Sequence, residues 1–133
     1  MSARPVISCG TAVVRHIITA LGIVLVGGCS SYGKVPEDRF PEAAGDALCQ
    51  RWRECERGSF ERDFYSMSDC REHLEREFIE LVDLADDLDC EYDSRGAGDA
   101  LNNLLEMSCE DFYEGEFYED YDKIWDDCSL VYF

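Results

Sequence analysis

The sequence has few of the features by which membrane, metal-binding and catalytic proteins are recognised. Its longest apolar run, residues 17–26, is ten residues long, about half the length that a membrane-spanning helix needs. It contains no Cys-x-x-Cys pair and only two histidines, His16 and His73, whereas a zinc site needs about four nitrogen or sulfur ligands at short spacing. These shortages argue against a membrane span and a zinc–thiolate site, and no catalytic constellation stands out.

Positive charge is also scarce. The chain has 12 Lys and Arg against 30 Asp and Glu, which gives a net charge of −18 at pH 7. Such a surface repels nucleic acid and anionic lipid head groups, so we expect any electrostatic partner to be a basic protein. Aromatic residues and regularly spaced cysteines argue against disorder, because disordered segments are poor in aromatic residues.

The amino-terminal residues are ordered like a bacterial export signal. Two arginines make the first part basic, the apolar run 17–26 follows, and Val26-Gly27-Gly28-Cys29 ends it. This last stretch resembles a lipobox, the recognition sequence of bacterial lipoproteins. The resemblance implies cleavage before Cys29, a lipid on its sulfur and acylation of the new amino group, and Ser30 implies sorting to the outer membrane. An ordinary secretory signal and a membrane span are the alternatives.

This interpretation divides the chain into three parts. Residues 1–28 are the lipoprotein signal peptide, residues 29–40 are a lipidated tether, and residues 41–133 are a cysteine-rich acidic helical domain. Fully extended, the tether would span about 40 Å. The membrane would be reached through the lipid on Cys29, and several acyl chains together give stable anchoring.

Six cysteines remain once Cys9 is removed with the signal and Cys29 is lipidated: Cys49, Cys55, Cys70, Cys90, Cys109 and Cys128. An even number in a short exported chain predicts three disulfides, whose pairing the sequence alone does not give. The last four are separated by 20, 19 and 19 residues, which fits one cysteine near each end of successive helices. Cys55–Cys70 is the best single pairing on this pattern, and the other two stay unassigned.

Apolar residues at helical spacing indicate an all-α protein. The capping-box patterns that begin at Ser66 and Ser108 mark helix starts. Short links between such helices favour a small, disulfide-stapled, antiparallel bundle of three to four helices. The predicted helices span 41–57, 67–88 and 94–107, followed by a short helical turn after Ser108 and a fourth helix around 117–128.

Breaks between these helices are also predicted. Gly58 is expected to end the first helix, and the aromatic residues of 60–65 are expected to form a loop that covers the end of the bundle. Strand-like residues are confined to 130–133, so a sheet is poorly supported.

The chain from Ala44 to Cys128 is similar to small, acidic, cysteine-rich predicted lipoproteins of the myxobacterial type. The similarity is carried by Ala47-Leu48-Cys49 with Trp52 and Cys55, by Cys90-Glu91-Tyr92-Asp93, by Leu101 to Leu105, and by Ser108-Cys109-Glu110-Asp111-Phe112. Related chains often carry a cysteine where this chain has Ala100, so no disulfide scheme is transferred. The family has no assigned function, and the resemblance implies location and fold only.

Acidic clusters are the remaining candidates for chemistry. One cluster consists of Asp83, Asp86, Asp87 and Asp89 with Glu91 and Asp93, and another spans residues 110–127. Calcium prefers about six to eight oxygen ligands, but the spacing of an EF-hand is absent, so a solvated acidic face is favoured. His73 stands among charged residues, as on an exposed helix surface, and the spacing of Trp52 and Trp125 favours core positions over a ligand platform.

The sequence therefore predicts a lipid-anchored protein of the cell envelope, with a structural or protein-binding role, no catalysis, no cofactor and no metal. A calcium- or ligand-binding envelope module is the alternative, and an envelope hydrolase is the weakest of the three hypotheses.

Overall fold

The computed structural model describes residues 32–126 and residue 128, and it confirms a mostly helical protein. Within these residues a short 3-10 helix and six α-helices are joined by tight connections, and two short strands pair with each other. The elements are η1 (Glu37–Arg39), α1 (Phe40–Cys55), α2 (Arg57–Asp63), α3 (Met67–Asp87), β1 (Glu91–Tyr92), α4 (Ser94–Glu106), α5 (Cys109–Glu114), α6 (Phe117–Tyr121) and β2 (Trp125–Asp126).

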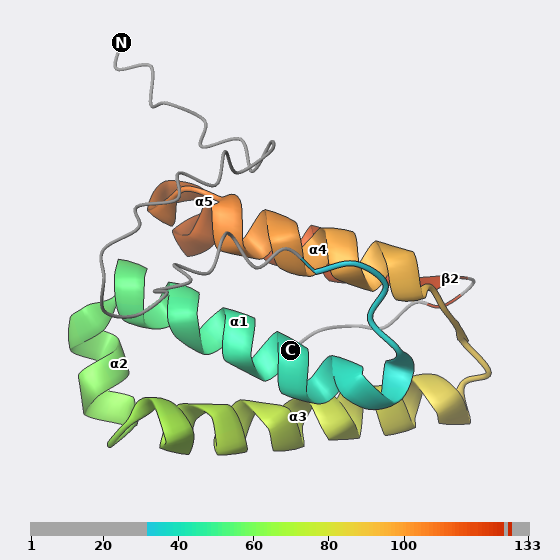
Figure 1. Cartoon of the computed structure of the whole chain (residues 1–133), viewed down its shortest axis with the longest axis horizontal. Helices are drawn as coiled ribbons and strands as arrows, with labels where there is room; N and C mark the ends of the chain where they lie inside the picture. Colours follow the sequence, from blue (N-terminus) through green and yellow to red (C-terminus); the bar gives the residue numbers. More distant parts are fainter. Residues whose placement is uncertain (1–31, 127, 129–133) are drawn as a thin grey trace, which may run out of the picture. The chain divides into compact units, whose positions relative to one another are not determined.

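The long helices form the predicted antiparallel bundle. Helix α1 lies between α3 on one side and α4 on the other; α1 and α4 run in the same direction, and α3 runs in the opposite direction (Figure 1). Helices α5 and α6 follow α4 and return the chain toward the sheet. None of the helices in the described part is both long and apolar enough to cross a bilayer.

Local sequence explains where the helices begin and end. Ser66 caps α3 by accepting from the Asp69 backbone N–H, and Ser108 caps α5 by accepting from that of Asp111, as the capping-box patterns predict. Helix α5 ends at Gly115, whose φ of 77° lies in the left-handed region that favours glycine.

Phe40 is the centre of the hydrophobic core. Its side chain is fully buried, and its ring makes edge contacts with four other aromatic rings at centroid distances of 5.4 to 6.1 Å. Such edge-to-face pairs stabilise beyond the area that they bury. The four partners are Phe78, Tyr92, Tyr121 and Trp125.

The predicted disulfide Cys55–Cys70 is wrong. Cys70 is bonded to Cys49, with Cα atoms 6.1 Å apart, and Cys55 is bonded to Cys109, with Cα atoms 5.2 Å apart. Helix α2 is the reason, because it extends the turn between α1 and α3. Cys70 therefore lies level with the middle of α1, and the end of α1 faces α5.

The third disulfide joins Cys90 to Cys128, with Cα atoms 5.3 Å apart. It links the end of α3 to the segment that follows β2. No cysteine in the described part is left free, so the expectation of three bridges is confirmed for these six residues.

Three local expectations need correction. The predicted loop at 60–65 is helical up to Asp63, and Gly58 lies inside α2 because α1 already ends at Cys55. The fourth helix ends at Tyr121 instead of residue 128, since β2 pairs with β1 and places Trp125 opposite Tyr92. The strand-like segment 130–133 lies outside the described residues.

Digestion of the non-reduced protein should release Cys49 and Cys70 in one linked peptide pair, identified by mass spectrometry. A peptide that links Cys55 to Cys70 would contradict the structure.

Replacing Cys49 and Cys70 together by alanine should lower the free energy of unfolding by about 3 kcal/mol, because the loop that they close is released in the unfolded chain. Denaturant unfolding measures this change.

Candidate functional site

Residues 32–36, here called the strap, lie on the bundle before η1 begins. The sequence assigns them to a free tether, but the Tyr32 backbone N–H donates to Asn102 Oδ1 at 2.7 Å, and Asn102 Nδ2 donates back to the Tyr32 carbonyl at 2.8 Å. The Val35 N–H donates to the Ser94 carbonyl at 2.9 Å, and the Tyr92 hydroxyl donates to the Val35 carbonyl at 2.9 Å. Two elements, α4 and β1, therefore hold the strap.

Gly98 makes this contact possible. It is buried on the face of α4 that the strap crosses, and a Cβ atom at this position would lie 1.8 Å from the Gly33 carbonyl oxygen. Glycine in a helix normally costs stability relative to alanine. Here the missing side chain allows two backbones to approach.

A groove of about 720 Å³ runs beside the strap. Two of its arginines are paired, since Arg39 lies 3.0 Å from Glu42 and Arg71 lies 2.5 Å from Asp46. Burial raises the pKa of the Tyr32 hydroxyl, the charge of Asp46 raises it further, and Arg71 lowers it. Tyr32 is therefore a neutral hydrogen-bonding group at pH 7, and the groove presents paired charges instead of a reactive side chain.

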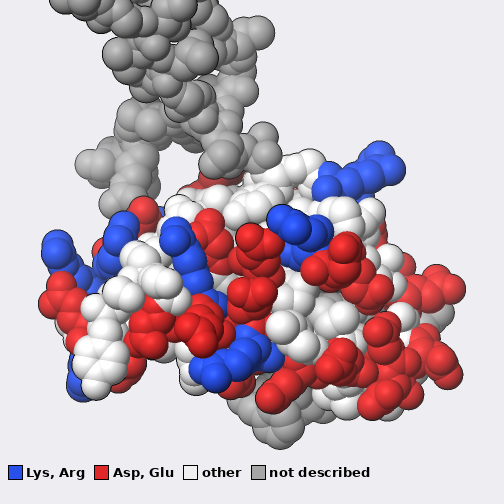
Figure 2. Space-filling view, turned by 60° about the horizontal axis from the view of Figure 1, so that its bottom comes forward, with Lys and Arg blue, Asp and Glu red and all other residues white. Residues whose placement is uncertain are grey.

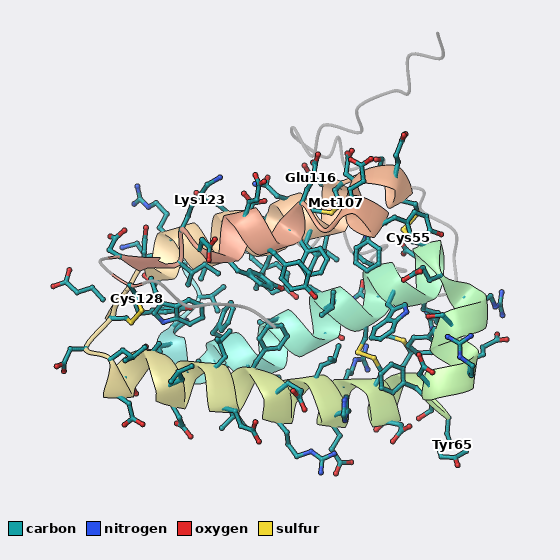
Figure 3. All side chains as sticks on the ribbon, turned by 180° about the vertical axis from the view of Figure 1, so that it is seen from behind. Cys55, Tyr65, Met107, Glu116, Lys123 and Cys128 are labelled. Carbon is teal, nitrogen blue, oxygen red and sulfur yellow. A yellow bond between two sulfur atoms is a disulfide. The ribbon has the colours of Figure 1, made fainter. Side chains whose placement is uncertain are left out.

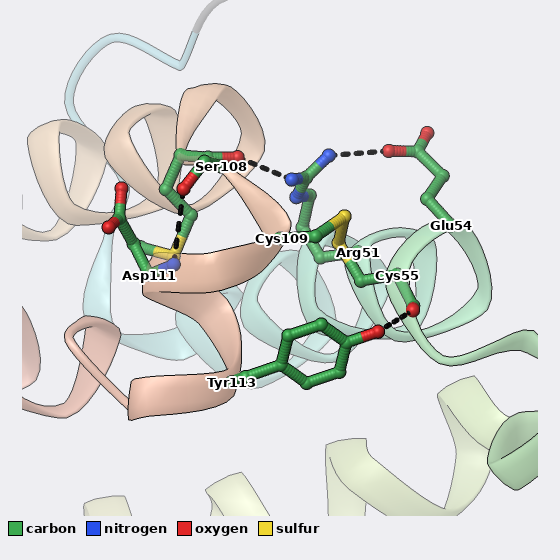
Figure 4. The surroundings of a disulfide bond; sticks show 8 residues. Arg51, Glu54, Cys55, Ser108, Cys109, Asp111 and Tyr113 are labelled. Carbon is green, nitrogen blue, oxygen red and sulfur yellow. Dashed lines mark hydrogen bonds and ion pairs between the residues drawn. A yellow bond between two sulfur atoms is a disulfide. The ribbon is translucent and has the colours of Figure 1, made fainter.

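A corner of the bundle is fixed around the Cys55–Cys109 disulfide (Figure 4). Arg51 reaches from α1 and donates to the Met107 carbonyl and, at 2.6 Å, to Glu54. Its side chain is only 11% exposed, and its charge meets the carbonyl end of α4, which attracts cations. The Tyr113 hydroxyl donates to the Cys55 carbonyl. The sequence gives no signal for this role of Arg51 other than its position three residues after Leu48 on the apolar face of α1.

The acidic residues predicted as one cluster gather where α3 ends. In Figure 2 acidic groups predominate at the end of the molecule that carries the end of α3, with a basic group projecting beside them, whereas basic groups are frequent at the α2 end. Asp83, Asp86, Asp87 and Asp89 are all exposed, and the last turn of α3 holds no basic residue. No group of metal-ligating side chains of the kind that holds an ion is found among the described residues.

A second acidic region surrounds the turn between α5 and α6. A hollow of about 370 Å³ lies there, and Met107 and Glu116 stand side by side at its edge (Figure 3). The negative charge of Asp111 is the largest cause that raises the pKa of Glu116, with smaller contributions from Glu114, Glu119 and Asp120. This region therefore carries a concentrated negative field.

Other residues singled out in the sequence have structural positions. His73 is exposed on α3, with its ring 5.7 Å from that of Phe64. Trp125 is buried beside Phe40, whereas Trp52 is half-buried and donates to Ser59 Oγ at 2.9 Å. The two tryptophans belong to different aromatic clusters and do not form one platform. Cys29 lies outside the described residues.

Comparison with known proteins assigns this chain to no family. No protein-family model matches the sequence, and searches of curated proteins and of solved structures give no match. The resemblance to acidic cysteine-rich lipoproteins stays a prediction that rests on the residues quoted for it.

Replacing Gly98 by alanine should weaken the strap, because the new Cβ would overlap the Gly33 carbonyl. Hydrogen exchange at the Tyr32 and Val35 amides should become faster, and the melting temperature should fall. Gly58→Ala is the matched control, since nothing lies within 4 Å of a Cβ at that helical position; it should stabilise by about 0.5–1 kcal/mol. Equal stabilisation by both changes would contradict the contact.

Glu116→Gln should raise the melting temperature at pH 7. The pKa of Glu116 is raised in the folded state, so the folded protein binds more protons than the unfolded chain between the ordinary and the raised value, and stability falls as pH rises through that window. The benefit of glutamine should disappear below the ordinary glutamate pKa of about 4.3. Glu72→Gln is the matched control, because it makes the same charge change at an exposed position of α3 outside this cluster. It should raise the melting temperature less than Glu116→Gln does. A Glu116→Gln benefit that is independent of pH would contradict the assignment.

Proposed function

We propose that this chain is a lipid-anchored protein of the bacterial cell envelope whose helical body binds another protein and performs no catalysis. The lipid would be carried by Cys29, at the end of the lipobox-like stretch. The outer membrane is the proposed location, since Ser30 follows the modified cysteine.

The complete pairing of the six later cysteines is the observation that carries this proposal. Disulfides persist in oxidising compartments such as the periplasm and the cell surface, and they are rare in the cytosol. Three bridges in a body of this size support export. The apolar run and Cys29 supply the matching signal in the sequence.

The position of the strap supports a short anchor. Only residues 29–31 separate the proposed lipid from Tyr32, which Asn102 holds against α4. Three peptide steps span at most about 11 Å. The anchored body would therefore stay close to the membrane, instead of moving on a long arm.

A binding role is supported by the structural contacts of Arg51 and His73 and by the groups that the surface exposes. Arg51 is used to cap α4, and His73 packs against a ring. The exposed surface offers carboxylates and a few large aromatic residues, and such a surface suits recognition of a basic protein.

Cys29→Ser should abolish the anchor. The wild-type protein, extracted from membranes with detergent, is expected to have an intact mass that starts at residue 29, with acyl chains and three disulfides. The Cys29→Ser protein should lack the acyl mass and leave the membrane fraction. Cys9→Ser is the matched control, because Cys9 lies in the removed segment, and it should change nothing in the mature mass. Wild-type protein that keeps its first 28 residues would overturn the proposal.

A further inference from the structure

A small groove lined by aromatic side chains lies between the end of α1 and the turn from α5 to α6. It has a volume of about 240 Å³, and we call it the aromatic groove. Its walls come from elements far apart in the sequence, and the Cys55–Cys109 disulfide joins those elements beside it. Its lining residues are Leu48, Trp52, Glu56, Phe112, Tyr113, Gly115, Phe117 and Tyr118.

The rings of this groove are both accessible and fixed. Tyr113 and Tyr118 are 57% and 46% exposed. The Tyr113 hydroxyl donates to the Cys55 carbonyl, and the Tyr118 ring lies against Gly115. A ligand that covers rings held in this way orders few side chains, so binding costs little conformational entropy.

The groove lies in a negative field. Glu56 is one of its lining residues, Glu114 follows Tyr113 in the chain, and Glu116 and Glu119 line the neighbouring hollow beside Met107. Arg51 and Arg57, at the end of α1 and the start of α2, are each paired with a glutamate. Lys123 is the one basic residue after Arg95 in the sequence, and it lies 3.2 Å from Asp120. The raised pKa of Glu116 reflects the same crowding of carboxylates. An apolar ligand without positive charge would leave this field uncompensated.

Arginine has the chemistry that matches both features. Its planar guanidinium group stacks on aromatic faces and donates two parallel hydrogen bonds to a carboxylate, whereas the lysine ammonium is a strongly hydrated point charge. We propose that the aromatic groove binds an arginine-bearing segment of a partner protein, with guanidinium groups stacked on Tyr113 and Tyr118 and paired with the surrounding glutamates. This inference names the partner class for the protein-binding role proposed above.

Two other occupants are less well matched. A second copy of this chain would bring two negatively charged surfaces together, which is unfavourable. The carboxyl-terminal segment 129–133 is apolar and carries no basic side chain, so it would not compensate the glutamates.

Binding of a labelled peptide to the mature protein in detergent tests this inference. The probe is a nine-residue peptide with three arginines separated by serine and glycine, and its affinity is measured by fluorescence anisotropy. A lysine peptide of the same charge should bind at least about threefold more weakly, because it stacks less well. Equal affinity for both peptides would leave only long-range charge attraction and would overturn the aromatic groove as the site.

Substitutions separate stacking from the general field. Tyr118→Ala should weaken binding of the arginine peptide about fivefold, as expected for loss of one cation–π contact, and Tyr118→Phe should restore most of the loss. Tyr65→Ala is the control, because this fully exposed tyrosine lies at the turn before α3. Equal losses for Tyr65→Ala and Tyr118→Ala would overturn the proposal.

Charge is tested with two matched triple variants. Glutamine at Glu114, Glu116 and Glu119 should weaken binding more than glutamine at Glu72, Glu77 and Glu80, which are exposed on α3. Equal effects would mean that only net charge matters, and they would overturn the site.

Two further outcomes separate this inference from the proposed function. A protein that has the expected acylated mass but binds the arginine peptide no better than a neutral peptide would overturn the groove inference alone. Binding that appears only after Tyr132→Ser and Phe133→Ser would assign the groove to the carboxyl-terminal segment and would likewise overturn it.

Discussion

Mutual repulsion among 30 acidic side chains opposes the folding of a protein whose hydrophobic core is small. A core of this size supplies only a few kcal/mol after the loss of chain entropy. Three disulfides counter both problems, because each restricts the unfolded chain by roughly 3 kcal/mol. They are also well distributed: Cys49–Cys70 joins α1 to α3, Cys55–Cys109 joins α1 to α5, and Cys90–Cys128 closes the far end.

The aromatic core around Phe40 fixes the start of α1. Because Phe40 touches rings of α3, α6 and both strands, the start of α1 cannot move without disturbing every layer. The strap that precedes it is held by Asn102 and Tyr92.

The corner of Cys55 and Cys109 carries the same rigidity to the opposite end, as the positions of Cys55 and Cys128 in Figure 3 show. Arg51 binds the end of α4 there, and Tyr113 is fastened to the end of α1. Exposed aromatic rings on a fixed support, with glutamates nearby, distinguish this corner from the acidic end of α3. The proposed arginine-binding groove depends on that support.

Local sequence determined most of the helices. Capping residues and apolar spacing act within a few residues, so α3 and α4 were predicted to within one or two positions, and the Ser108 capping box predicted the start of α5. The even number of cysteines likewise predicted three bridges. Composition fixed the negative charge, from which a basic partner is predicted.

Tertiary structure alone decided the pairing of the cysteines, the contact of the strap and the aromatic groove. Cys70 bonds Cys49 because α2 lengthens one turn, and no local pattern records how two helices then align. Gly98 is an unfavourable residue for a helix, and only the contact with the Gly33 backbone explains why glycine is needed there. Tyr113 and Trp52 meet only after α5 returns to α1, since contacts between distant segments depend on packing and not on the spacing of neighbours.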